Sequence, residues 1–178
     1  MFIELLKKRR SIRRFEDRPV EKEKIDVLIE AALRSPTSRS FNPWEFIVIT
    51  DRKMIADLSK AKIHGSNFLE NATLAIVVAA DPQKSDVWVE DASIASILIH
   101  LQAADLGLGS CWIQIRLREH SDDTSAEQYV AERIGLKEGM VVESIIAIGY
   151  PAEQKEGHPE SSLLKNKVSY GMYGQQER

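Results

Sequence analysis

The stretch "LAIVVAAD", residues 74–81, decides the fold that the sequence predicts. Its first seven residues are all apolar, and the run stops only at Asp81. A strand with one face in water alternates apolar and polar side chains, whereas a strand covered on both faces reads as a continuous apolar run. We therefore predict that this stretch is a central β-strand with other elements packed on both of its faces.

Further strands and helices are predicted on either side of this run. The clearest helix covers residues 21–34, where Ile25, Leu28 and Ala32 recur at helical spacing and Pro36 disfavours continuation. Further predicted helices cover residues 2–10, 52–61, 87–106 and 124–134, and further predicted strands cover residues 45–51, 109–115 and 143–151.

The order of these elements indicates the fold class. Strands and helices are mixed without strict alternation, which favours an α+β fold of three layers over a doubly wound sheet. We expect a central mixed or antiparallel sheet flanked by helices, in a single domain over residues 1–178. The extended C-terminal tail, residues 152–178, is polar and has no core of its own. It is expected to lie along another surface, either of this subunit or of a partner.

The composition is that of a globular protein. Hydrophobic residues make up 43% and charged residues 29%, and the net charge is -3. This acidic balance argues against a general nucleic-acid binder. Cys111 is the only cysteine, the N-terminal run "MFIELL" is interrupted by Glu4, and no segment reaches the length of a transmembrane helix. We therefore predict a cytoplasmic protein that engages neither membrane nor nucleic acid.

Several common catalytic motifs are missing from the sequence. It contains no G-x-G-x-x-G after a strand, no P-loop and no G-x-S-x-G. The four histidines show no metal-ligand spacing, so no metal site is predicted. Cys111 falls within an apolar strand and is interpreted as a buried, inert thiol. If the protein is an enzyme, its chemistry belongs to a bound cofactor.

A dense basic block, "KKRRSIRR", occupies residues 7–14. A solvated charged face is one interpretation, and a surface for a polyanion or a protein partner is another. A phosphate site is the third, because Ser11 supplies a hydroxyl between Arg10 and Arg13, and arginine offers a fork of donors that matches phosphate oxygens. The block alone leaves the solvated face slightly favoured.

The loop "SPTSRSFNPW", residues 35–44, favours the phosphate interpretation. It contains four hydroxyl side chains, two prolines and Asn42. Most loops of this kind are only connectors. However, an asparagine side chain both donates and accepts hydrogen bonds, as the edge of a pyrimidine-like ring requires. A phosphate clamp together with a stiff loop of this kind suits a nucleotide-like cofactor.

Over nearly its whole length the sequence resembles the flavin-dependent nitroreductase superfamily, in its small single-domain form. "RRSIRRF" is similar to the N-terminal signature of that family, and "SPTSRSFNPWEF" to its proline- and serine-rich loop. "LGLGSCWI", the "GYP" after the last strand, and "LKNKVSYGMYG" near the end also resemble family segments, and all five occur in the family's order.

The resemblance implies a homodimer with two FMN sites at the subunit interface, each built from both chains. Arg9, Arg10 and Ser11 would hold the phosphate and ribityl end, and Arg13 would lie near N1 and O2 of the ring. The loop of the other subunit would contact the ring and the ribityl chain through Pro36, Thr37, Ser38, Ser40 and Asn42, and Asn67 would lie at the pyrimidine edge. The strand against the ring would be Trp112, Ile113, Gln114 and Ile115. A C-terminal basic pair, Lys165 and Lys167, would complete the phosphate site.

The implied activity is the transfer of hydride from NAD(P)H, through N5 of FMN, to an electron-poor small molecule such as a nitroaromatic or a quinone. Because NAD(P)H and the acceptor would occupy the same site in turn, ping-pong kinetics are predicted. The reaction needs no protein nucleophile. Three positions depart from the family pattern and put the substrate in doubt: Ser40, Glu70 and Ile115. Reductive dehalogenation or flavin fragmentation on the same fold is one alternative. A non-catalytic protein that binds a polyanion or a partner through the basic block is another.

Overall fold

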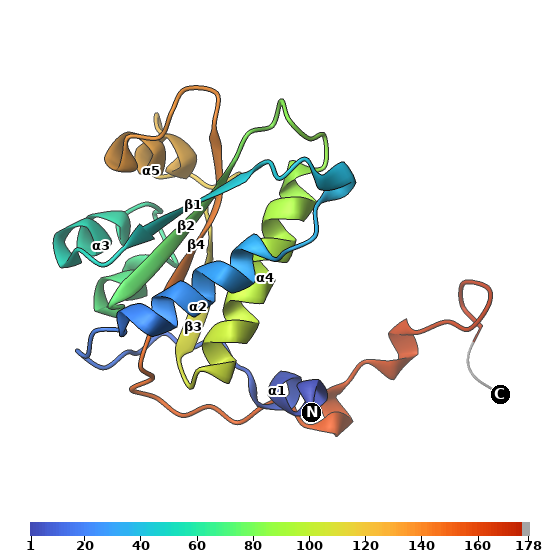
Figure 1. Ribbon diagram of the computed structural model, residues 1–178. Helices are drawn as coiled ribbons and strands as arrows, with labels where there is room; N and C mark the ends of the chain where they lie inside the picture. Colours follow the sequence, from blue (N-terminus) through green and yellow to red (C-terminus); the bar gives the residue numbers. More distant parts are fainter. Residues whose placement is uncertain (176–178) are drawn as a thin grey trace.

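The computed structural model describes residues 1–175, and its centre is a four-stranded antiparallel sheet (Figure 1). The strands are β1 (Trp44–Ile49), β2 (Leu74–Ala80), β3 (Gly109–Gln114) and β4 (Val141–Gly149), and their order in the sheet is β1-β2-β4-β3. All seven residues of β2 are buried. The prediction of a central strand covered on both faces is therefore confirmed, and of the two predicted sheet types the antiparallel one is found.

Helices cover both faces of the sheet, so the fold has three layers. On one face α2 (Lys22–Leu33) and α4 (Trp88–Asp105) pack on alternate strand residues that include Ile76 and Ile146. On the other face α3 (Arg52–Leu58) and α5 (Ala126–Ile134) pack on residues that include Val77 and Ile145. Successive side chains of a strand point to opposite faces, so each strand serves both cores.

The helix ends follow from local capping. The side chain of Asp51 accepts a hydrogen bond of 2.8 Å from the N–H of Met54 at the start of α3, and Ser125 accepts one of 3.1 Å from Gln128 at the start of α5. Helix α5 ends at Gly135, whose φ of 64° is readily adopted only by glycine. These caps set the two shorter helices on the α3–α5 face.

The N-terminal helix α1 (Phe2–Lys8) is shorter than the predicted helix over residues 2–10. At Arg9 the backbone turns to ψ 132°, and the chain continues as an extended segment beside β3. Ser11 forms a parallel bridge with Ser110, and the N–H of Ile12 donates to the Ser110 carbonyl at 3.0 Å. The basic block is thus divided between a helix end and a strand-like segment at the sheet edge.

Glycine at position 109 permits this close approach. A Cβ there would lie 2.7 Å from Cγ2 of Ile12, inside the normal contact distance of two carbon atoms. The Ile12 side chain is buried in the core, which holds the neighbouring arginines at the sheet edge.

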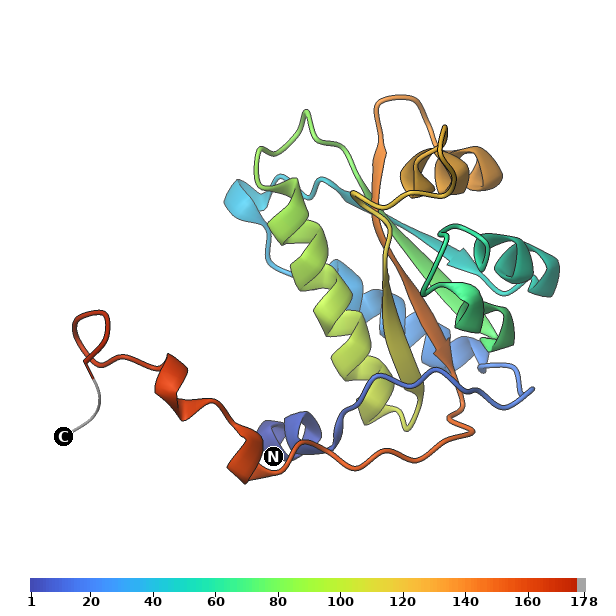
Figure 2. The same cartoon turned by 180° about the vertical axis from the view of Figure 1, so that it is seen from behind.

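The tail leaves the body after Pro151 and extends past α1, as both views show (Figures 1 and 2). It contains two short 3₁₀ helices, η3 (Glu160–Ser162) and η4 (Lys165–Lys167). Six large apolar side chains lie exposed along it: Leu163, Leu164, Val168, Tyr170, Met172 and Tyr173. The expectation that the tail lacks a local core is met. Within residues 1–175, no helix has the length and apolar character needed to cross a membrane.

Candidate functional site

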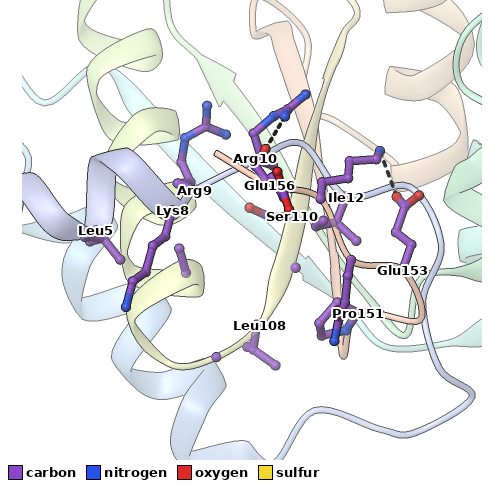
Figure 3. A pocket seen from close by; sticks show the side chains of 15 residues that line it. Leu5, Lys8, Arg9, Arg10, Ile12, Leu108, Ser110, Pro151, Glu153 and Glu156 are labelled. Carbon is purple, nitrogen blue, oxygen red and sulfur yellow. Dashed lines mark hydrogen bonds and ion pairs between the residues drawn. The ribbon is translucent and has the colours of Figure 1, made fainter. Parts of the chain in front are cut away.

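A cavity of about 590 Å³ lies between the end of α1, the start of β3 and the segment that follows β4 (Figure 3). Apolar side chains line part of its wall, including Leu5, Ile12 and Leu108. The remainder of the wall is strongly charged, with four cations and two carboxylates: Lys8, Arg9, Arg10, Lys155, Glu153 and Glu156. The cavity therefore adjoins the basic block that the sequence singles out.

The positive charge in this cavity is only partly neutralised. Lys155 pairs with Glu153 at 2.9 Å, and Arg10 donates to the backbone carbonyl of Glu156. Across residues 1–175, neither Arg9 nor Arg10 forms an ion pair with a carboxylate. Both side chains are partly shielded from water, so they favour an anionic ligand.

The segment after β4 also fixes the shape of the basic block. The carboxylate of Glu153 accepts hydrogen bonds from the backbone N–H of Arg13 at 2.6 Å and of Arg14 at 3.3 Å. The Arg13 bond is the main cause of the lowered pKa of Glu153. Lys155 donates to the Ser11 carbonyl at 3.0 Å. These two residues were missed by sequence reasoning, which treated everything after "GYP" as tail.

The outer edge of β3 is the second part of the site. Because the Ser110 carbonyl faces outward to Ile12, the alternation of an antiparallel strand turns the backbone groups of Trp112 and Gln114 outward as well. The side chains of Ile113 and Ile115 are buried in the core. This strand therefore presents backbone N–H and C=O groups to a ligand at its edge.

Arg13 is exposed and lies on the α3–α5 side of this edge. Its guanidinium carbon is 5.6 Å from the centre of the Phe68 ring, which places Arg13 beside η2 (Asn67–Asn71). Asn67 is exposed next to Phe68, and Glu70 is also exposed. The Cys111 thiol is buried, and burial raises its pKa while nearby Arg13 opposes that rise. The prediction of a buried thiol is confirmed, but its position beside Arg13 was not foreseen.

A row of polar groups lies on the opposite side of β3, facing α4. His100 Nδ1 and the Ser110 hydroxyl are 2.7 Å apart, and the His100 ring stacks on Trp112. The indole N–H of Trp112 donates to the side-chain oxygen of Gln114 at 2.9 Å. This row ties the edge strand to α4. It also leaves His100 almost fully buried.

This burial predicts an acid-sensitive stability. Burial, and then the charge of Arg9, lowers the pKa of His100 to about 4. An unfolded chain has an ordinary histidine pKa near 6.5, so between that pH and about pH 4 the unfolded state binds a proton that the native state does not bind. This proton uptake stabilises the unfolded state. Between pH 7.5 and pH 5 we expect His100 to remove about 2 kcal/mol of the free energy of unfolding.

Urea unfolding of the protein and of His100→Gln at both pH values measures this effect. The variant should lose about 2 kcal/mol less than the parent over the same interval. His64→Gln, which changes an exposed histidine, serves as the matched control and should follow the parent. Equal losses in the parent and His100→Gln would contradict the assignment.

The loop over residues 35–44 is strained and anchored. Arg39, Ser40 and Asn42 have φ values of 51°, 57° and 45°, a region that L-residues rarely adopt. The N–H of Ser38 donates at 2.9 Å to the buried carboxylate of Asp91, and Thr37 donates to the Asn42 side chain at 2.9 Å. The loop is thus held in one shape while Pro36, Ser40 and Asn42 stay exposed.

A single chain does not bring the predicted site residues together. The loop is attached at Asp91, near the start of α4, whereas Ala104, near its end, lines the arginine cavity. Thirteen residues of helix separate these points by about 20 Å. Lys165 pairs with Glu160 in the tail at 3.2 Å, and the tail leads away from the cavity (Figure 2). The basic block, which includes Arg13, lies beside β3. The loop over residues 35–44 and the tail residues Lys165 and Lys167 lie away from both.

The chain is similar to known proteins in both sequence and fold. The family model described as "Nitroreductase family" matches residues 6–65 and 64–150. An FMN-dependent nitroreductase from Clostridium difficile R20291 superposes with a TM-score of 0.95 at 48% identity, over 96% of this chain and 99% of that one.

Two sequence relatives differ in how much of the chain they match. A protein of Archaeoglobus fulgidus, provisionally named NADH dehydrogenase/NAD(P)H nitroreductase, is 38% identical over 158 residues, which are 86% of this chain and 87% of that protein. Rat iodotyrosine deiodinase 1 is 47% identical over 53 residues, which are 30% of this chain and 19% of that protein. With a family model matched over most of its length and relatives of this closeness, the chain belongs to the nitroreductase family.

Proposed function

We propose that the protein is an FMN-dependent oxidoreductase that takes hydride from NAD(P)H and delivers it to an electron-poor small molecule such as a nitroaromatic or a quinone. The observation that carries the proposal is the pair Arg9 and Arg10, which meets no carboxylate within the described part of the chain and lies at the open edge of β3. Membership of the nitroreductase family supports it, as do the names of the relatives from C. difficile and A. fulgidus.

The residues present fit FMN. A phosphate needs several cationic donors, and Arg9 and Arg10 supply them from the wall of the cavity, whereas the Ser11 hydroxyl faces the Cys111 thiol. A flavin ring needs backbone donors and acceptors along its polar side, and the outward backbone groups of Trp112 and Gln114 supply them. The spacing along one strand edge suits an elongated ligand that has a phosphate at one end and a ring at the other.

The chemistry divides between cofactor and protein. When bound, FMN supplies the N5 centre that accepts hydride from the nicotinamide and gives it up to the acceptor. Arg13 would place a positive charge near the pyrimidine side, where negative charge gathers on reduction, and so favour the reduced form. Asn67 would hydrogen-bond the same side. Ile113 and Ile115, buried beneath the edge, keep water from that part of the strand.

A two-fold dimer would complete the site. The loop with Thr37, Ser38 and Asn42 lies at one end of α4, and the arginine cavity lies at the other. Pairing two copies with their α4 helices antiparallel would set the loop of each beside the cavity of the other, because such an interface is isologous. Ile94 and Ile97 of α4 are exposed large apolar residues that this pairing would cover. The tail, with Lys165 and Lys167, would pack along the partner.

Reductive dehalogenation is the second candidate within the same fold. Its support is the match to rat iodotyrosine deiodinase 1, which covers only 30% of this chain. A second iodotyrosine deiodinase, from Thermotoga neapolitana, covers 92% of this chain at only 20% identity, whereas the A. fulgidus relative is 38% identical over 86% of it, so the NAD(P)H oxidoreductase remains the favoured function.

Reconstitution tests the proposal directly. We expect the purified protein to take up FMN and to turn yellow. Under anaerobic conditions NADH or NADPH should bleach the flavin absorbance, and a quinone should restore it in a separate second step. Protein that stays colourless after incubation with FMN would refute the proposed function. Flavin that is bleached by NAD(P)H but reoxidised only by an iodinated phenol would favour the dehalogenase.

A further inference from the structure

Lys62 and Arg118 lie on two neighbouring loops beside the candidate site. The N–H of Ile63 donates to the Glu119 carbonyl at 3.3 Å, and the ring Nδ1 of His120 is 2.9 Å from the Lys60 carbonyl. These two contacts hold the loop after α3 against the loop after β3. Lys62 and Arg118 therefore belong to one surface rather than to two independent loops.

Neither cation is neutralised there. Lys62 is half-buried, and no ion pair joins Lys62 or Arg118 to a carboxylate anywhere in residues 1–175. This holds although Glu119, Asp122 and Asp123 follow in the same loop. Burial, and then the charge of Arg118, lowers the pKa of Lys62. Two like charges on adjoining loops repel each other, and an anion bound by both would offset that repulsion and the cost of half-burying Lys62.

The pair lies at one end of the flavin edge, which is the outer edge of β3 that the flavin ring is proposed to occupy. Arg118 follows Gln114, the last residue of β3, by four residues. The loop that carries Lys62 runs on to Phe68, which contacts Arg13. Lys62 is therefore at the border of the same site, on the side away from the phosphate cavity.

From this placement we propose that Lys62 and Arg118 form an anion-binding pair that holds a carboxylate or phosphate of the molecule reacting at the flavin edge. The inference rests on the proposed function and adds a substrate class to it, namely planar acceptors with a carboxylate, or a donor nucleotide with an extra phosphate. The ammonium and the guanidinium would each give a charge-assisted hydrogen bond to that anion.

Binding of two isosteric probes to the FMN-loaded protein tests this pair. Calorimetry should show that Lys62→Gln weakens benzoate binding by about 10-fold and Lys62→Gln/Arg118→Gln weakens it further, because each change removes a charged donor. Benzamide, which has the same shape and no charge, should change less than about 2-fold. Lys60→Gln is the matched control, since it removes the same charge from the same loop but from a side chain that pairs with Asp57.

Steady-state kinetics distinguish whether the bound anion is a carboxylate of the acceptor or a phosphate of the donor nucleotide. Loss of kcat/KM for 4-nitrobenzoate with 4-nitrobenzamide unchanged assigns the pair to an acceptor carboxylate, and loss for NADPH with NADH unchanged assigns it to a nucleotide phosphate. Either result supports the pair. Equal losses for charged and neutral ligands, or no loss in the double variant for benzoate, 4-nitrobenzoate and NADPH alike, overturn it. If the parent protein reduces 4-nitrobenzamide normally in that case, the proposed function stands and only this inference fails.

Discussion

Replacing Arg9 with alanine is expected to weaken FMN binding by about 10- to 100-fold, which corresponds to the 1.5–3 kcal/mol typical of a hydrogen bond to a charged group. Arg9 lines the cavity next to Arg10 and has no carboxylate partner within residues 1–175, so its donors can bind a phosphate. Lys167→Ala should have an effect of similar size if the tail supplies the second cation. Fluorescence titration of FMN into the protein freed of cofactor measures both.

Arg14→Ala is the matched control for this pair of variants. Arg14 belongs to the same basic block and is exposed, and its hydrogen bonds within residues 1–175 are made by its backbone, to Glu153 and Ala152. Its removal should leave the FMN affinity within about 2-fold of the parent, as a surface charge contributes little. A loss in Arg14→Ala as large as in Arg9→Ala would indicate a diffuse charge effect. A polyanion-binding function would predict that pattern, together with no effect of Lys167→Ala.

The architecture could be predicted from the sequence because it depends on strong local patterns. The uninterrupted apolar run of β2 predicted cover on both faces, and the helical spacing around Leu28 predicted a helix with one buried face. Element ends were less exact. The strand predicted to start at residue 143 begins at Val141, and the first helix stops at Lys8 instead of residue 10. At these ends tertiary contacts decide, and a local pattern does not contain them.

Only part of the candidate site could be predicted from the sequence, for a similar reason. The resemblance pointed to the basic block, and the structure places that block at an open strand edge. The neighbours that shape it come from distant positions: Glu153 holds the Arg13 backbone from 140 residues away. Lys62 and Arg118 share one surface only because their two loops are joined by hydrogen bonds. Charged residues in loops give no periodic signal, so nothing in the sequence distinguishes these from ordinary surface charge.

The division of the site between the two ends of α4 leads to the second large expected effect, in mixed dimers. Two variants are needed: Arg9→Ala damages the cavity, and Thr37→Ala/Asn42→Ala removes the paired side chains of the loop. Each homodimer should bind little FMN. If the loop of one subunit completes the cavity of the other, a purified heterodimer of the two variants contains one undamaged site and should bind one FMN per dimer.

The reciprocal pairing decides between the two possible architectures. A heterodimer of the parent chain with a chain that carries all three substitutions has the same number of altered side chains. With sites shared between subunits both of its sites are damaged, so it should bind almost no FMN. With sites built from one chain the parent subunit keeps an intact site, and this second heterodimer should bind one FMN while the first binds none. Because the two architectures predict opposite stoichiometries in both heterodimers, partial folding of either variant cannot produce the expected result. The measurement therefore tests whether the distance of about 20 Å along α4 is bridged by a second copy of the chain.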